Sequence, residues 1–189
     1  MSRIIQGDWL AAYMEFVKNT ESPLSYHWWT GIATIAGAFQ RKVFFNRGLG
    51  RVYPNMYIVL VGPAGRTRKS EAMRVGERLF TALGLPKGAE DITKQGMIQA
   101  LTASKSNFFN PVTQSPEDHC SLSIYSKELS TFIGQKDVAF LAVLTDWYDS
   151  DDSWKYKTRG RGDEEINGVC LNILAATAPD WIPSMFPNE

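Results

Sequence analysis

The sequence has little cysteine and no excess of either charge. Its 189 residues include only two cysteines, Cys120 and Cys170, each in or beside an apolar stretch, and no C-x-x-C pair. This pattern argues against a disulfide framework or a cysteine-rich metal site, and we expect two buried free thiols. The 20 basic and 20 acidic residues cancel, so any contact with nucleic acid must come from a local patch.

Long hydrophobic runs, internal repeats and low-complexity tracts are absent as well. No apolar run approaches 18 residues, and the N-terminus lacks a basic-then-apolar signal, so we expect a cytoplasmic protein with no membrane partner. What the chain does have is 44% hydrophobic residues and six tryptophans. This composition predicts a folded globule with a real core.

Residues 1–50 are predicted to form a helical lead-in that packs on the core. Apolar residues at helical spacing predict a first helix at 9–17. Ser22 reads as the N-cap of a second helix, with Pro23 at its first helical position and its end near Phe39. A short strand at 40–45 and a loop at 46–50 should follow.

Residues 51–189 are predicted to form the core, in which strands alternate with helices. We expect strands at 56–61, 122–125 and 169–175, helices at 70–83, after 91–93 and around 138–144, a surface loop at 107–118 and a hairpin before the last strand. The alternation predicts an α/β fold with a mostly parallel sheet that helices cover on both faces.

A Gly-rich loop between an apolar strand and a helix is the most informative stretch. Phosphate binding uses close backbone N–H groups, a helix N-terminus, a Lys for the outer phosphates and a hydroxyl for Mg²⁺. All four are present here, so the stretch predicts a nucleotide site in which Lys69 has a catalytic role and Ser70 binds Mg²⁺. This predicted phosphate loop, called the P-loop below, consists of Gly62, Pro63, Ala64, Gly65, Arg66, Thr67, Arg68, Lys69 and Ser70.

The spacing of the P-loop departs from the Walker A pattern G-x-x-x-x-G-K-[ST]. Gly62 lies seven residues before Lys69, one more than the pattern has, and Arg68 stands where a Gly is usual. The alternative is an ordinary strand-to-helix turn that happens to end in Lys-Ser.

Two further strand ends carry candidate residues. Glu128 follows an apolar strand that we expect beside the P-loop strand, where an acid can orient the attacking water; Lys127 replaces the usual Asp, and Ser126 could bond a metal-bound water. Thr177 ends the last strand and could sense the γ-phosphate. Glu128 could instead be a plain helix-start acid, and Thr177 a plain strand end. Ligands bind at the carboxyl ends of parallel strands, which predicts one rim for Gly62, Glu128 and Thr177.

A basic stretch near the C-terminus is the candidate nucleic-acid contact. In an extended conformation its cations share one face, and Trp154, Tyr156 and Thr158 share the other. Such a ribbon could bind a nucleic-acid backbone, or it could be a charged edge strand that neighbouring acids neutralise. We call this set the basic ribbon: Lys155, Lys157, Arg159 and Arg161.

The order of these motifs resembles the P-loop ATPase domains of phage and plasmid helicase–primase proteins, long catalogued as a domain of unknown function. The resemblance rests on the block from Trp28 through the P-loop, and on Ser126-Lys-Glu-Leu-Ser130, Leu144-Thr-Asp-Trp-Tyr-Asp149, Trp154-Lys-Tyr-Lys-Thr158 and Leu171-Asn-Ile-Leu-Ala-Ala-Thr-Ala-Pro-Asp-Trp181.

The resemblance implies a RecA-like or superfamily 3-like ATPase that uses ATP and Mg²⁺ to move on DNA during replication. Lys69, Ser70, Glu128 and Thr177 would carry the nucleotide chemistry, and the basic ribbon would contact DNA, most readily single-stranded. The resemblance also implies assembly into a homo-oligomeric ring and a primase or other replication protein as partner. It implies the cytoplasm of a bacterial or phage-infected host cell as the location. Family members continue with a further strand and an Arg-bearing segment, so a truncated copy is expected. The alternative is a degenerate P-loop module that binds nucleotide or a partner protein without turnover.

Overall fold

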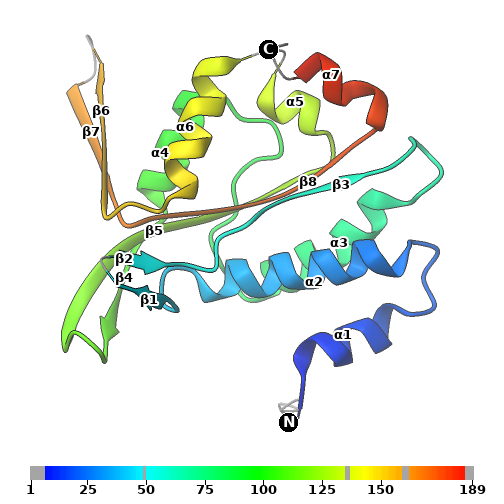
Figure 1. Cartoon of the computed structure of the whole chain (residues 1–189), viewed down its shortest axis with the longest axis horizontal. Coiled ribbons are helices and arrows are strands. Elements are labelled where there is room, and N and C mark those ends of the chain that lie inside the picture. Colours follow the sequence, from blue (N-terminus) through cyan, green and yellow to red (C-terminus); the bar gives the residue numbers. More distant parts are fainter. Residues whose placement is uncertain (1–6, 49, 135–136, 159–161, 186–189) are drawn as a thin grey trace.

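The computed structural model describes residues 7–48, 50–134, 137–158 and 162–185. Its centre is a four-stranded sheet in the order β3-β8-β5-β4 (Figure 1). The strands β3, β8 and β5 are parallel, and the edge strand β4 is antiparallel to β5. An α/β fold with a mostly parallel sheet is therefore confirmed. The bounds are β3 Tyr57–Val61, β4 Lys105–Asn110, β5 Ser115–Ser126 and β8 Val169–Thr177.

The central position of β8 follows from its composition. All nine of its residues are buried, which is typical of a parallel strand that is covered on both faces. Ile173 of β8 is paired with Tyr57 of β3 on one side and with Ile124 of β5 on the other. The two cysteines are free and buried in this region, as predicted.

Helices cover both faces of the sheet (Figure 1). On one face α2 (Leu24–Phe39) and α3 (Lys69–Ala82) pack over a core cluster that includes Leu60, Phe80 and Leu174. On the other face α4 (Lys94–Ala103), α5 (Leu129–Ile133) and α6 (Val138–Tyr148) pack over a larger cluster around Trp147. The first helix, α1 (Trp9–Val17), packs on α2.

The remaining elements are short. Two antiparallel hairpins, β1 (Phe45–Arg47) with β2 (Gly50–Val52) and β6 (Ser153–Thr158) with β7 (Gly162–Asn167), stand beside the main sheet. After β8 the chain turns through η1 (Pro179–Trp181) into α7 (Ile182–Met185). Within the described residues, no helix combines the length and the apolar character that crossing a bilayer requires.

Four local predictions were wrong. The stretch predicted as a loop at 46–50 contributes Asn46 and Arg47 to β1 and Gly50 to β2. The stretch at 107–118 is not a loop but most of the β4–β5 hairpin; its polar side chains fit because this part of the sheet is largely exposed. The strand predicted at 40–45 starts only at Phe45, since Gln40 takes a positive φ of 53° and the chain turns there. Ser22 is not the cap of α2: its hydroxyl donates to the Arg68 carbonyl instead.

Candidate functional site

The P-loop connects β3 to α3, as the sequence predicts. Gly65 and Arg68 take left-handed backbone conformations, with φ of 69° and 49°, and α3 begins at Lys69. The side chain of Arg68 makes no capping hydrogen bond with any described residue. The N-terminal N–H groups of a 14-residue helix therefore face the loop without a side-chain cap, an arrangement that suits an anion.

The amine of Lys69 lies back across the loop. Its Nζ donates to the Gly62 carbonyl at 2.5 Å and to the Pro63 carbonyl at 3.2 Å, and it lies 3.5 Å from the Thr67 hydroxyl. A phosphate group offers the same amine stronger acceptors, because hydrogen bonds between two charged groups exceed those to neutral carbonyls. The three N–H donors of Lys69 face these three loop oxygens, so a phosphate would compete with them for the amine.

A cavity of about 260 Å³ lies beside the loop and gathers residues from three strand ends. Lys69 and Ser70 line it from the start of α3, and Glu128 lines it from the segment after β5. Thus the structure brings together the predicted phosphate, Mg²⁺ and water-positioning residues. The full lining is Ala64, Gly65, Arg68, Lys69, Ser70, Glu71, Lys127, Glu128, Ala178 and Trp181.

Thr177 reaches the P-loop through its backbone. Its side chain is buried, and its hydroxyl donates to the Ala178 carbonyl at 3.3 Å, while its carbonyl accepts from the Gly62 N–H at 3.2 Å. The rest of the predicted P-loop, Gly62, Pro63, Arg66 and Thr67, adjoins the cavity without lining it. The end of β8 is therefore bonded to the P-loop through the backbone, independently of the Thr177 side chain.

The surroundings of Glu128 differ from the prediction in two respects. Its strand β5 is not beside the P-loop strand, because β8 lies between β5 and β3. Glu128 is exposed at the start of α5, and its side chain makes no capping hydrogen bond with a described residue, so its carboxylate can face a ligand. Lys127 forms an ion pair of 2.5 Å with Glu90. The Ser126 hydroxyl is buried and donates to the Glu128 carbonyl at 3.1 Å, so it does not point at a metal shell.

The donor set at this cavity suits a nucleotide-bound Mg²⁺. Such an ion takes most of its ligands from phosphate and water, with one or two protein oxygens. The Ser70 hydroxyl and the Glu128 carboxylate line the same cavity and can supply them. Among the described residues there is no group of three His, Cys, Asp or Glu that could hold a metal by itself.

Trp181 was missed in the sequence reasoning. It lies in η1, directly after the β8 end, lines the cavity and keeps 49% of its surface exposed. A lone Trp a few residues beyond a strand-end Thr is the signal that could have suggested it.

The basic ribbon shows the predicted two faces where the structure describes it. Lys155 and Lys157 are exposed on β6, whereas Trp154 and Tyr156 are half-buried and stacked on each other at 5.7 Å. The aromatic pair packs inward: Trp154 meets Trp147 of α6 edge-on at 5.3 Å, and Lys94 of α4 lies 4.7 Å from the Tyr156 ring. These half-buried rings thus pack against the larger core cluster.

The β7 strand pairs with the strand that carries the lysines of the basic ribbon, and one of its acids reaches a lysine. Lys155 is paired across the hairpin with Glu165, at 3.5 Å between Nζ and Oε1, and Lys157 is in register with Asp163. Arg159 and Arg161 lie outside the described residues. The charge of the ribbon is therefore partly compensated by its own hairpin.

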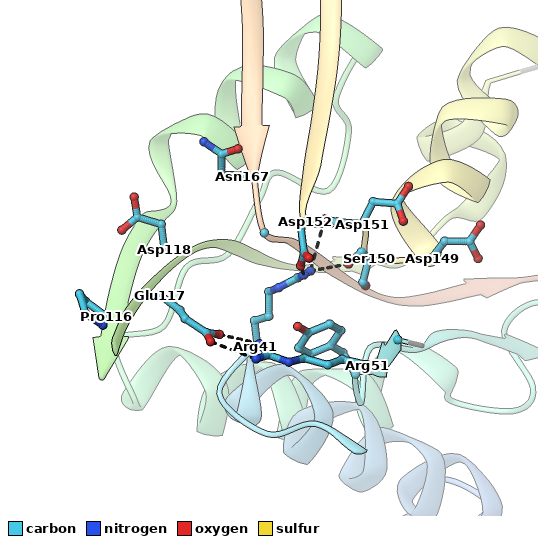
Figure 2. A pocket seen from close by; sticks show the side chains of 13 residues that line it. Arg41, Arg51, Pro116, Glu117, Asp118, Asp149, Ser150, Asp151, Asp152 and Asn167 are labelled. Atoms are coloured by element: carbon cyan, nitrogen blue, oxygen red, sulfur yellow. Dashed lines mark hydrogen bonds and ion pairs between the residues drawn. The ribbon is translucent and has the colours of Figure 1, made fainter. Parts of the chain in front are cut away.

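A second, larger cleft of about 860 Å³ lies at the opposite end of the sheet, near the amino ends of the parallel strands (Figure 2). Its two arginines are already engaged. Arg41 is buried, donates to the Ser150 and Val169 carbonyls and pairs with Asp152, and Arg51 forms a two-pronged ion pair with Glu117 at 2.8 and 3.1 Å. The Arg51 guanidinium holds the pKa of Glu117 below its usual range.

Five carboxylates line this second cleft against its two arginines, so the cleft is acidic and does not suit phosphate. Figure 2 shows Glu117 and Asp118 on one side and the acids between α6 and β6 on the other: Asp149, Asp151 and Asp152. The cavity beside the P-loop is therefore the stronger candidate for an anionic ligand. No protein-family model matches this chain, and a search of curated proteins finds no match.

Proposed function

We propose that this chain is the ATP-binding core of a phage-type replicative DNA helicase. The observation that carries the proposal is the cavity that unites the start of α3, Glu128 and the segment after β8 at the carboxyl ends of three parallel strands. That is where α/β folds bind their ligands.

In this proposal the triphosphate lies on the uncapped N-terminus of α3. Lys69 leaves the Gly62 and Pro63 carbonyls and binds the outer phosphates, and the loop N–H groups bind the remainder. Ser70 and Glu128 hold Mg²⁺, which neutralises phosphate charge when bound. Glu128 also orients the attacking water. The bond from Gly62 N–H to the Thr177 carbonyl lets the end of β8 respond to the loop.

The proposed partner is single-stranded DNA, contacted by the basic ribbon at the exposed face of Lys155 and Lys157. Assembly into a homo-oligomeric ring and association with a primase belong to the same proposal. They rest on the resemblance of the motif order.

A second candidate, a P-loop module that binds nucleotide without turnover, is favoured by the position of Lys127. A Lys, paired with Glu90, stands where an acid of the Mg²⁺ shell would be. Glu128 is the only acid that directly follows β5. The residues that would bind the phosphates are therefore present, whereas one of the two acids usual for hydrolysis is replaced by Lys127.

ATP hydrolysis distinguishes the helicase proposal from the module that binds nucleotide without turnover. The test measures ATP binding by calorimetry and ATP hydrolysis with and without single-stranded DNA. The helicase proposal expects hydrolysis that DNA stimulates, and a Glu128→Gln variant that binds ATP normally but turns over roughly a hundredfold or more slowly. The control is Glu15→Gln, which neutralises an exposed acid on α1.

The outcomes distinguish the two candidates. Normal ATP binding with no hydrolysis, with or without DNA, would favour the binding module. No ATP binding at all would reject both.

A further inference from the structure

The first turn of α2 and the residues before it contact both ends of the P-loop. Tyr26 donates its hydroxyl to the Val61 carbonyl at 2.7 Å, at the end of β3. Ser22 donates its hydroxyl to the Arg68 carbonyl at 2.9 Å, directly before α3. Glu21 adds an exposed ion pair of 3.0 Å with the Arg68 guanidinium. The helical lead-in therefore donates hydrogen bonds to the Val61 and Arg68 carbonyls, which lie at the two ends of the P-loop.

Tyr26 also packs against the first residue of the loop. A Cβ added to Gly62 would run into the Tyr26 hydroxyl and would come within 2.8 Å of the Thr67 hydroxyl. A side chain at Gly62 would therefore displace the Tyr26 hydroxyl or the Thr67 side chain; Gly62 allows this close approach, and its φ is not positive. Tyr26 and Thr67 both lie against Gly62.

These contacts matter most when Lys69 is occupied by a ligand. In the structure Lys69 itself closes the loop through the Gly62 and Pro63 carbonyls. A phosphate that binds the Lys69 amine weakens its bonds to these carbonyls, although the loop N–H groups must then keep pointing at the ligand. The hydrogen bonds that then remain at the ends of the loop come from Tyr26 and the Thr177 carbonyl at one end. At the other end Ser22 shares the Arg68 carbonyl with the N–H groups of Glu71 and Ala72 in α3, and Ser22 supplies the bond from outside that helix.

We propose that Tyr26 and Ser22 are positioning residues of the phosphate site, which hold the P-loop in its binding shape from the helical lead-in. The inference rests on the proposed nucleotide binding and names a role for residues outside the P-loop itself. Neither side chain lines the cavity, so both act through the loop backbone.

The chain offers a matched control for Tyr26. Tyr57, on the same strand as Val61, donates its hydroxyl to the Leu144 carbonyl at 2.8 Å, on the side of the sheet away from α2. Tyr57→Phe and Tyr26→Phe therefore delete the same kind of bond, and only Tyr26→Phe touches the loop. Ser104→Ala, which deletes a hydroxyl-to-carbonyl bond of 2.8 Å at the end of α4, is the control for Ser22→Ala.

The test has one arm with ligand and one without. With ligand, calorimetry measures the affinities for ATP, for inorganic tripolyphosphate and for adenosine. Tyr26→Phe and Ser22→Ala should each weaken ATP and tripolyphosphate by roughly three- to tenfold, the worth of one hydrogen bond, and leave adenosine unchanged. The two controls should leave all three affinities unchanged even where urea unfolding shows an equal loss of stability.

Without ligand, hydrogen–deuterium exchange follows the peptide that covers 62–70. Faster exchange in Tyr26→Phe and Ser22→Ala, but not in the controls, supports the anchoring. Exchange at the wild-type rate in both variants overturns it. If wild-type protein binds neither ATP nor tripolyphosphate, the proposed function fails on that arm, and the exchange arm still decides whether Tyr26 and Ser22 hold the loop.

Discussion

Replacing Lys69 with alanine tests the phosphate site most directly. The change removes one cation at the start of α3 together with its bonds to the Gly62 and Pro63 carbonyls. The fold should survive, because the Pro63 side of the loop is exposed and its carbonyl can bind water instead. The loss in the free energy of unfolding should be about 1 kcal/mol, below the range of about 1.5–3 kcal/mol for bonds to charged groups, because the contact with Pro63 is exposed and water can replace the amine there.

The expected loss of nucleotide affinity is larger than the loss of stability. A hydrogen bond to a charged group contributes about 1.5–3 kcal/mol, or about 10- to 150-fold in affinity. In the ligand-free protein Lys69 already donates to Gly62 at 2.5 Å, so part of the gain from phosphate is offset by the bond it gives up. We therefore expect the lower end of this range, about tenfold, for Lys69→Ala.

Calorimetric titration with ATP and Mg²⁺, beside urea unfolding of the same samples, measures both effects. Lys105→Ala is the control: it removes an exposed lysine that forms an ion pair of 2.8 Å with Asp118 on the β4–β5 hairpin. Wild-type ATP affinity in Lys69→Ala, with the fold intact, would refute the reasoning and leave the loop as an ordinary strand-to-helix turn.

Two further predictions concern charge and pH. Replacing the four cations of the basic ribbon with alanine should weaken the salt dependence of single-stranded DNA binding and leave ATP affinity unchanged. The slope of log K against log salt should become smaller by up to about 2.8, which is about 0.7 for each of four phosphate contacts. Equal slopes would show that the ribbon is only a charged edge strand. Burial lowers the pKa of His119, and the nearby charges of Lys42 and Arg41 lower it further, so the unfolded chain takes up a proton first as the pH falls. The free energy of unfolding should therefore decrease as the pH drops below about 6.5 and level off below the folded-state pKa. Urea titrations between about pH 7.5 and 5 should show a shallower decrease in His119→Gln, and an identical decrease would contradict the assignment.

The local pattern of the sequence was enough to predict the elements that carry the P-loop. An apolar run into a Gly-rich loop, followed by amphipathic spacing, gave β3 and α3 to within one residue at each end. The alternation along β6 likewise predicted which side chains of Trp154–Lys157 are exposed, because side chains in a strand alternate between faces. These features depend on neighbours in the sequence.

What the sequence did not reveal depends on partners far along the chain. That β8 lies between β3 and β5, that Glu165 faces Lys155, and that 107–118 forms a hairpin are matters of strand pairing, which no local period specifies. The hydroxyl of Ser22 illustrates the same limit. Its position before a helix predicts an N-cap, yet a carbonyl 46 residues away takes the bond.

The sequence by itself therefore determined the α/β class, the buried free thiols and the chemistry available at the P-loop. Only the tertiary structure decided which of those groups meet. It brought Glu128 and Trp181 to the cavity beside Lys69, left the Thr177 side chain outside the lining of that cavity, and placed Tyr26 and Ser22 at the two ends of the loop. The physical reason is that side-chain periodicity is set within a few residues, whereas the order of strands in a sheet is set by which faces and edges the whole chain can bury together.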